Sequence, residues 1–269
     1  MTDLRASFTG SIPEYYDNCL GPAWFDSFAQ DLAQRLPKKP PGDVLELACG
    51  TGMLTRSVRS RLDPGCRLVA TDISKAMLDY ARAKLPGANV DWREADAAKL
   101  PFADGEFGAV VCGFGVMFVP DRSGVFREAR RVLKTGGILL FNVWDRIEEN
   151  AAARMNAEVI EELFPGDEEV RFRTPYEMHD AGLLGSLLAG SGFRQMRLER
   201  KRIEIDGISA RNIALGQIRG TPRSLLLQKR GADLDEIVAT VTAALARIGG
   251  DPYRGHAQAV VVEAVASSA

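Results

Sequence analysis

The chain has 269 residues, of which 46% are hydrophobic and 26% charged, a balance typical of a globular protein with a substantial core. Its formal net charge of −2 gives no overall attraction to nucleic acid or to an anionic membrane, so we expect neither as a partner. No run approaches the ~20 apolar residues of a membrane helix, and the N-terminus lacks the apolar core of a signal peptide. We therefore expect a cytoplasmic protein.

Residues that commonly bind metals are sparse and scattered. The four cysteines form no C-x-x-C pair, and the only two histidines, His179 and His256, lie far apart in the sequence. A structural zinc site needs four such ligands, most of them at short spacings. The sequence therefore predicts no metal site.

The first half of the chain alternates between strand and helix patterns. Residues 1 to about 22 form a polar and aromatic leader, helical spacing follows over 21–36, and the prolines of "PKKPPG" end that helix. The predicted strands are 44–48, 66–73, 89–97, 107–118 and 138–145, and the predicted helices between them are 53–62, 74–85 and 123–133. Such alternation predicts an α/β fold with a doubly wound parallel sheet.

After residue 145 the rhythm changes. Helices are predicted over 149–164 and 178–192, a strand over 193–205, a helical insertion over roughly 207–248, and a last strand over 256–268 that could pair with the strand before the insertion. We expect four parts: a lid and helix (1–40), a ligand-binding core (41–145), a first helical cap segment (146–190) and C-terminal strands with their helical insertion (191–269). The two helical segments are expected to cover the ligand edge of the sheet.

The stretch "VLELACGTG" joins a buried strand to a glycine turn. Val44, Leu45 and Leu47 read as strand, while Gly50 and Gly52 permit a tight turn that a ligand can approach closely. A helix follows, so free N–H groups point outward from its first turn. This arrangement predicts a nucleotide-type site.

Two carboxylates follow at the ends of the next two strands. Asp72 can accept hydrogen bonds from both hydroxyls of a ribose, and Asp96, beside the small Ala97, suits the exocyclic amine of an adenine. Taken singly, each aspartate could be a helix cap or a turn residue, and Ser74 is an alternative cap for the helix that starts at Lys75. Jointly with the glycine turn, they predict a site for an adenosine.

The glycine spacing selects among adenosine cofactors. A dinucleotide fingerprint, G-x-G-x-x-G, would need a third glycine where Thr55 stands, and no Gly-Lys-Ser/Thr ending of a phosphate-binding loop occurs. A turn that contacts its ligand without a phosphate favours S-adenosylmethionine over a nicotinamide dinucleotide.

Four ordered stretches carry a family resemblance: "VLELACGTG", "ATDIS" followed by "AML", "READAAKLPFADGEFGAVVCGFGVMFVPD" and "REARRVLKTGGILLFNVWD". They resemble the successive motifs of class I S-adenosylmethionine-dependent methyltransferases, above all the small-molecule branch that includes ubiquinone- and menaquinone-biosynthesis enzymes. The resemblance spans Val44 to Asp145, and Ala48 stands where the family usually has its first glycine. It implies a Rossmann-like, mostly parallel seven-stranded sheet with an antiparallel last strand and helical cap insertions, and S-adenosylhomocysteine as the product formed from the cofactor.

The resemblance also implies which residues contact the cofactor, most of them at the ends of the first four strands. They are Ala48, Gly50 and Gly52 for the methionyl part, Asp72 for the ribose, Ile73, Met77, Asp96 and Ala97 for the adenine, and Cys112, Gly113 and Phe114 beside the transferable methyl group. Core packing is an equal alternative for Ile73, Met77 and Phe114.

Two further residues are assigned to the same site. Glu46 is expected to orient the glycine turn rather than to move protons. In related methyltransferases an N-terminal aromatic segment folds over the cofactor, and Tyr16, ahead of Tyr15, is the candidate here. The alternative is that both tyrosines pack on the first helix.

No catalytic base declares itself in the sequence. His179 and His256 are weak candidates, since a lone histidine is more often a surface or capping residue. We expect methyl transfer to a small organic molecule, with an oxygen, carbon or nitrogen acceptor left open, in a monomer or homodimer. The alternatives are a non-catalytic protein that binds S-adenosylmethionine and a nicotinamide-dependent oxidoreductase.

Overall fold

The sheet is built from seven strands in the order β3-β2-β1-β4-β5-β7-β6. The computed structural model describes residues 8, 10–171 and 173–267. Strands β1 to β5 run parallel, while β7 is antiparallel to both β5 and β6. The strands are β1 (Asp43–Glu46), β2 (Leu68–Asp72), β3 (Asp91–Glu94), β4 (Phe107–Gly113), β5 (Leu133–Trp144), β6 (Phe193–Ile208) and β7 (Tyr253–Ala266). The expected fold class, with its antiparallel last strand, is confirmed.

The strand sequences explain why the sheet is covered on both faces. All five residues of β2 and the first six of β4 are buried, as expected for inner strands of a parallel sheet that is covered on both faces. Adjacent residues of β4 join different apolar clusters. Val110 packs in a cluster with Phe126 and Leu184, and Val111 packs in a cluster with Leu32 and Val58. The core is therefore two layers, one on each face of the sheet.

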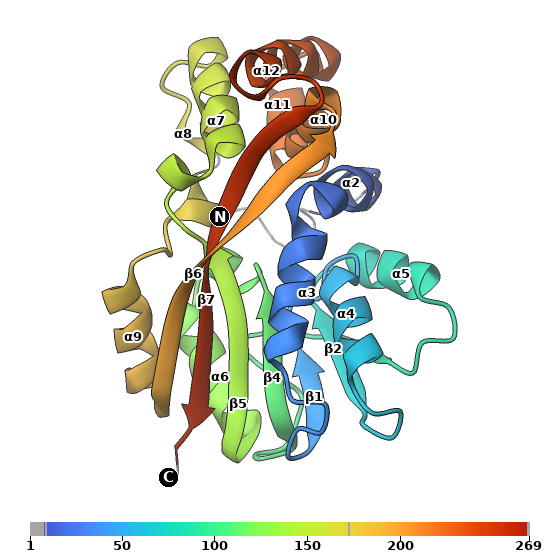
Figure 1. The fold of residues 1–269 in the computed structure, drawn as a ribbon, viewed down its shortest axis with the longest axis vertical. Coiled ribbons are helices and arrows are strands. Elements are labelled where there is room, and N and C mark those ends of the chain that lie inside the picture. Colours follow the sequence, from blue (N-terminus) through green and yellow to red (C-terminus); the bar gives the residue numbers. More distant parts are fainter. Residues whose placement is uncertain (1–7, 9, 172, 268–269) are drawn as a thin grey trace.

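The helices that cover these faces are α3 (Asp26–Arg35), α4 (Met53–Arg61), α5 (Lys75–Lys84), α6 (Arg122–Val132) and α9 (Ala181–Gly190). In Figure 1, α3 and α4 lie side by side in front of the sheet, and α6 packs against α9. Strand order reverses at β1, which lies between β2 and β4. Ligands of such sheets bind beside the carboxyl ends of the strands at this point.

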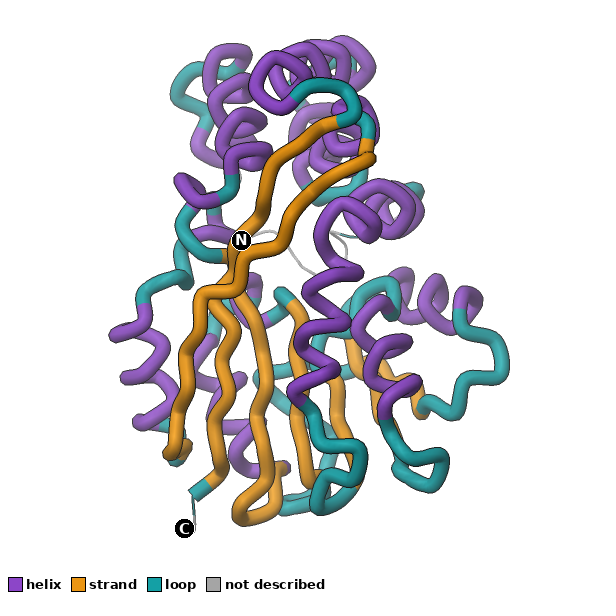
Figure 2. Tube along the Cα trace, in the orientation of Figure 1, coloured by secondary structure: helices purple, strands orange, loops and turns teal. Residues whose placement is uncertain are grey.

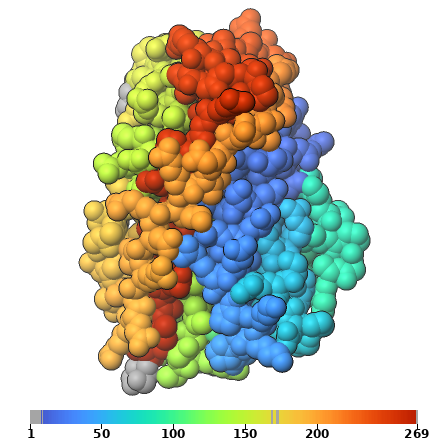
Figure 3. Space-filling model, in the orientation of Figure 1, coloured from blue at the N-terminus to red at the C-terminus, as the bar shows by residue number. Residues whose placement is uncertain are grey.

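The N-terminal helical run starts earlier than the sequence predicted. Residues up to about 22 were expected to form a leader, but α2 (Ile12–Tyr15), a π-helix η1 (Tyr16–Phe25) and α3 follow one another without a break. Gly21 and Pro22 were expected to mark the start of the helix, but they lie inside the π-helix. The wider turns of a π-helix let the Asp26 N–H donate a hydrogen bond to the Gly21 carbonyl, five residues earlier. In Figure 3 the blue surface of this run lies between the orange surface of β6 and the light blue surface of α4.

Two element boundaries inside the core also differ from expectation. The strand predicted over 107–118 ends at Gly113, because Phe114 adopts a left-handed φ of 56° and a 3-10 turn, η2 (Val116–Phe118), follows. Strand β5 starts at Leu133 rather than at 138, since the "KTGG" segment continues the strand. Both differences arise from backbone geometry that apolar patterning does not encode.

A helical cap sits above the carboxyl edge of the sheet. It contains α7 (Ala151–Leu163), α8 (Glu168–Arg171), α10 (Ala210–Arg219), α11 (Arg223–Lys229) and α12 (Leu234–Gly249), with the 3-10 turns η3 (Ile147–Glu149) and η4 (Thr174–Tyr176). Strands β6 and β7 extend beyond the other strands as a two-stranded ribbon that leads to α10 and from α12 (Figures 1 and 2). The short helices α8 and α11 were not predicted.

The described part of the chain has no helix that is both long and apolar enough to cross a membrane.

The contact between Gly108 of β4 and the turn before β1 gives a test of this packing. A methyl group on Gly108 would overlap the Gly42 nitrogen and lie 2.7 Å from the Pro41 carbonyl carbon, and neither backbone atom can rotate away. We predict that Gly108→Ala lowers the free energy of unfolding by ~1–3 kcal/mol.

The control is Gly65→Ala, since Gly65 is exposed and has open space around its Cα. That variant should match the parent or gain up to ~1 kcal/mol. Urea unfolding of the three proteins measures both values, and equal stability of the two variants would contradict the packing described.

Candidate functional site

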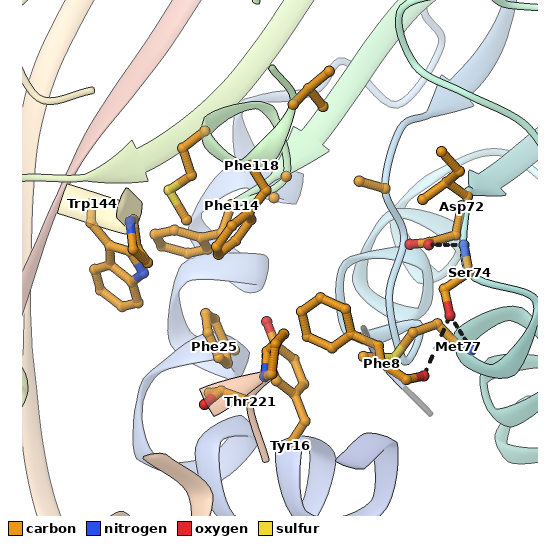
Figure 4. A pocket seen from close by; sticks show the side chains of 18 of the residues that line it. Phe8, Tyr16, Phe25, Asp72, Ser74, Met77, Phe114, Phe118, Trp144 and Thr221 are labelled. Atoms are coloured by element: carbon orange, nitrogen blue, oxygen red, sulfur yellow. Dashed lines mark hydrogen bonds between the residues drawn. The ribbon is translucent and has the colours of Figure 1, made fainter. Parts of the chain in front are cut away.

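One cavity of about 420 Å³ lies between the carboxyl edge of the sheet and the cap. Its walls come from η1, from the segments that follow β1 to β5, and from α7, η4, α10 and α11. Figure 4 shows Asp72 and Ser74 on one side of it and Phe114, Phe118 and Trp144 on the other. This volume and its mostly apolar lining are typical of a site for a small organic ligand.

The glycine turn is held by its own hydrogen bonds. The Gly50 N–H donates to Oδ2 of Asp72 at 2.9 Å, and the Gly52 N–H donates to the Cys49 carbonyl at 3.0 Å. Ala48, Gly50 and Gly52 all have a left-handed φ, which a turn this tight requires. Of these three predicted contacts, Ala48 lines this cavity, whereas Gly50 and Gly52 line neither it nor a smaller cavity of about 50 Å³ beside Glu46, and they shape the turn.

Asp72 sits at the end of β2 with both carboxylate oxygens engaged. Besides the bond from Gly50, its Oδ1 accepts from the Ser74 N–H at 2.8 Å. Burial raises the pKa of Asp72, and the N–H groups of Ser74, Gly50 and Ile73 oppose that effect. The Ser74 hydroxyl accepts a hydrogen bond from the Met77 N–H, so Ser74 is the N-cap of α5. Asp72 is therefore not needed as the cap of this helix. Asp72 itself lines the cavity.

The predicted adenine contacts lie next to Asp72. Ile73, Met77, Asp96 and Ala97 all line the cavity. Asp96 also stabilises its own turn, since Oδ1 accepts from the Ala98 N–H at 2.9 Å. The turn role and a ligand role are compatible, because a carboxylate has further lone pairs to offer.

At the end of β4, two of the three predicted residues face the cavity. Gly113 and Phe114 line it, whereas Cys112 is 1% exposed and lines neither cavity. The Cys112 sulfur lies under the next turn, only 2.8 Å from the place that a Cβ on Gly115 would take. The ring of Phe114 both borders the cavity and packs on Trp144, with 4.3 Å between centroids.

The N-terminal aromatic residues contribute one wall. Tyr16 lines the cavity and stacks on Phe25 with 4.8 Å between centroids, and the Phe8 ring meets Tyr16 edge-on (Figure 4). The Phe8 carbonyl accepts from the Ser74 hydroxyl at 3.4 Å, which ties the segment to the end of β2. Tyr15 instead lies under the Arg219 guanidinium, so of these two neighbouring tyrosines it is Tyr16 that lines the cavity.

Glu46 lies beside the large cavity rather than in it. It is fully buried, lines the smaller cavity of about 50 Å³ together with Cys49 and Thr51 of the glycine turn, and lies beside Thr55 of α4. That it orients the glycine turn stays a prediction. Burial, with a smaller contribution from Asp72, raises the pKa of Glu46 to about 8, and Thr55 opposes the shift.

Neither histidine reaches the cavity. His179 Nδ1 lies 2.8 Å from the Tyr176 carbonyl in the loop after η4, and His256 Nδ1 lies 2.8 Å from the Arg202 guanidinium on the β6–β7 ribbon. The two weak candidates for a base are therefore not brought to the site. Within the described residues, no group of three or more His, Cys, Asp or Glu could hold a metal ion.

Sequence reasoning missed the residues that the cap contributes. Asn156 of α7, Tyr176 of η4, Gln217 of α10 and Arg223 of α11 line the cavity, as does Trp144 at the end of β5. Of these residues, only Trp144 could have been predicted from the sequence, because it stands at the carboxyl end of a predicted strand. The others belong to segments that match no motif.

Arg223 is the most unusual of them, since its guanidinium is buried with 5% of the residue exposed. Burial lowers the pKa of Arg223 to about 10, and the nearby Tyr176 phenol opposes the shift. Burial also raises the pKa of Tyr176.

Comparison with known proteins identifies the core of the chain. Residues 45–141 match a family described as a methyltransferase domain. The chain is 32% identical over 141 residues to the demethylmenaquinone methyltransferase of Lactobacillus johnsonii, across 50% of this chain and 58% of that protein. It is 43% identical over 96 residues to the ubiquinone/menaquinone biosynthesis C-methyltransferase of Desulfotalea psychrophila, across 36% of this chain and 39% of that protein.

A solved structure extends the likeness to the whole fold. Phosphoethanolamine N-methyltransferase 2 of Haemonchus contortus, solved with phosphomonomethylethanolamine and S-adenosylhomocysteine, has a TM-score of 0.63 at 19% identity, across 100% of this chain and 61% of that one. Residues 45–141 are thus similar to the methyltransferase domain of these quinone-biosynthesis enzymes, as the motifs indicated. The alignment of the chain covers less than two thirds of the length of these two curated relatives.

The raised pKa of Glu46 predicts a pH dependence of stability. The folded-state pKa of about 8 exceeds the ~4.3 of an unfolded chain, so the unfolded state releases a proton between these values while the folded state keeps it. Glu46 therefore makes the protein lose stability as pH rises through this window, by at most ~1.4 kcal/mol per pH unit.

Glu46→Gln should remove that loss. The stability difference between Glu46→Gln and the parent should shift in favour of the variant from pH 5.5 to pH 8 and then level off, as measured by urea unfolding without ligand. The exposed Glu94→Gln is the control and should show no such trend. A difference that stays constant across this range would refute the assignment of the shift to Glu46.

Proposed function

We propose that the protein binds S-adenosylmethionine along the carboxyl edge of the sheet and transfers its methyl group to a small organic molecule held under the cap. The observation that carries this proposal is a single cavity. It runs from Asp72 and Asp96, which suit an adenosine, to cap residues such as Asn156 and Gln217. A cofactor and a second ligand can therefore share one enclosed space.

The residues present fit this cofactor. Asp72 has lone pairs left for ribose hydroxyls, Asp96 for the adenine amine, and Ile73 and Met77 give an apolar surface for the base. The methionyl end would then point toward Ala48, Gly113 and Phe114. The aromatic faces of Tyr16 and Phe114 favour a cation such as a sulfonium.

The hydrogen bonds of the glycine turn favour this cofactor over a dinucleotide. A pyrophosphate needs free N–H groups at the turn, but the Gly50 N–H is taken by Asp72 and the Gly52 N–H by Cys49. This argues against the nicotinamide-dependent oxidoreductase as the alternative.

S-adenosylmethionine supplies a methyl group on a positively charged sulfur, which leaves as a neutral thioether. The chain's residues position the acceptor and exclude water, and such positioning contributes up to ~7–11 kcal/mol in favourable systems. The histidines lie outside the cavity, and burial raises the pKa of both lining tyrosines, Tyr16 and Tyr176. The site thus suits an acceptor that is already nucleophilic rather than one that needs a base.

Parallel calorimetric titrations with S-adenosylmethionine, S-adenosylhomocysteine and NAD test the cofactor. We expect binding of the two adenosyl-sulfur ligands in the micromolar range and none of NAD. Binding of NAD alone would overturn the proposal. Turnover of labelled methyl groups in a substrate screen then separates an enzyme from a non-catalytic protein that binds the cofactor.

Asp72 provides a residue-level prediction. Asp72→Asn keeps the size of the side chain but removes its charge and one acceptor, so the dissociation constant for S-adenosylhomocysteine should rise about tenfold or more, ~1.4 kcal/mol. The control is Asp79→Asn, an exposed carboxylate on α5, which should bind as the parent does.

Because Asp72 also anchors the glycine turn, a second comparison isolates the ribose contact. The parent should bind adenosine more tightly than 2′,3′-dideoxyadenosine, and Asp72→Asn should no longer distinguish the two nucleosides. Equal discrimination in both proteins would place the ribose elsewhere.

A further inference from the structure

The cap end of the cavity combines apolar walls with buried polar groups. Trp24 and Trp144 supply aromatic surface, while Asn156, Gln217 and Arg223 supply polar groups from three different helices. These polar residues are 3%, 7% and 5% exposed, respectively. Groups of this kind are costly to bury unless they bind one another or a ligand.

Two of these groups lack a partner. Among the described residues, no hydrogen-bond donor reaches Oδ1 of Asn156 or Oε1 of Gln217. A buried polar atom left unsatisfied costs ~1–3 kcal/mol, and both side chains line the cavity. A ligand that donates hydrogen bonds to these two oxygens would offset that cost.

The buried guanidinium of Arg223 specifies the charge of such a ligand. Burial disfavours its positive charge, as the lowered pKa indicates, and an anionic oxygen group beside it would stabilise that charge. A guanidinium presents several N–H donors in a fixed plane that matches a carboxylate. Arg223 is the one Lys or Arg among the described residues that line the cavity, so a single negative charge fits better than a phosphate dianion.

The backbone around Arg223 is fixed. The Thr221 hydroxyl donates to the Gln217 carbonyl at 2.9 Å, and the Ser224 hydroxyl donates to the Thr221 carbonyl at 3.0 Å. A methyl group on Gly220 would lie 2.8 Å from the Tyr16 nitrogen, so this turn packs directly on the N-terminal run. Gln217 and Arg223 are thus held at the cavity by the same packed turn, as a preformed subsite requires.

We propose that this cap subsite binds the acceptor substrate through an anionic oxygen group, with Arg223 as its charge partner, while the side-chain oxygens of Gln217 and Asn156 accept hydrogen bonds from N–H or O–H donors elsewhere on the same molecule. The acceptor is then a flat, largely apolar monoanion, such as an aromatic carboxylate, whose rings lie between Trp24, Trp144 and Phe114. This assignment rests on the proposed function, since it places the acceptor beside a bound cofactor.

The test uses 2-naphthoate and 2-naphthamide as probes, titrated calorimetrically into protein saturated with S-adenosylhomocysteine near neutral pH. The two molecules have the same size and rings, and the amide carries N–H donors that the unpaired oxygens could accept. Without an anion subsite the amide would bind as well or better. We expect 2-naphthoate to bind about tenfold more tightly or better.

Three variants test whether this preference for the anion arises at the subsite. Arg223→Gln should abolish it while the affinity for S-adenosylhomocysteine stays unchanged, and Arg211→Gln, which removes an exposed charge on α10, should preserve it. Gln217→Glu is nearly isosteric and puts a carboxylate of the chain into the subsite, so it should weaken 2-naphthoate and spare 2-naphthamide. It serves as the test if Arg223→Gln fails to fold.

The outcomes separate the two proposals. Failure of S-adenosylhomocysteine to bind would contradict the proposed function. Normal binding of S-adenosylhomocysteine with no binding of 2-naphthoate, or with no preference for it, would overturn the anion subsite alone. A preference that survives in both Arg223→Gln and Gln217→Glu would also overturn it.

Discussion

The hydrogen bonds to the Asp72 carboxylate are the constraint on which the rest of the site depends. They join the end of β2 to the turn after β1 through Gly50, and to the start of α5 through Ser74. The carboxylate therefore fixes the turn, takes up an N–H that a phosphate would need, and remains at the cavity wall with lone pairs to spare. One buried charge thus sets both the shape of the edge and the class of cofactor that we propose for it.

The cap completes the site from sequence that carries no motif. The β6–β7 ribbon carries α10 to α12 over the carboxyl edge, and the N-terminal run lies between that cap and the sheet. Tight contacts at Gly216 and Gly220, where an added methyl group would meet Leu20 or Tyr16, hold these two segments together. The acceptor end of the cavity is therefore made by the packing of remote segments, and its chemistry is set by the few polar side chains that this packing buries.

The core and its glycine turn could be predicted because their signals are local. Apolar runs mark strands β1, β2 and β4, and Asp72 and Asp96 stand at strand ends where the fold gathers ligand contacts. The π-helix through Pro22 and the left-handed φ of Phe114 escaped prediction, since both depend on backbone geometry imposed by tertiary packing. Arg223 escaped too, because a surface arginine and a buried one look alike in a sequence.

The proposed function requires one cavity that holds the cofactor on the sheet side and leaves the cap side for the acceptor. A crystal structure of the complex with S-adenosylhomocysteine would show whether this is so. We predict ribose hydroxyls within hydrogen-bond distance of Asp72, adenine between Met77 and Asp96, and an open space bordered by Asn156 and Arg223. A ligand that extends into the cap, or that lies away from Asp72, would contradict the account.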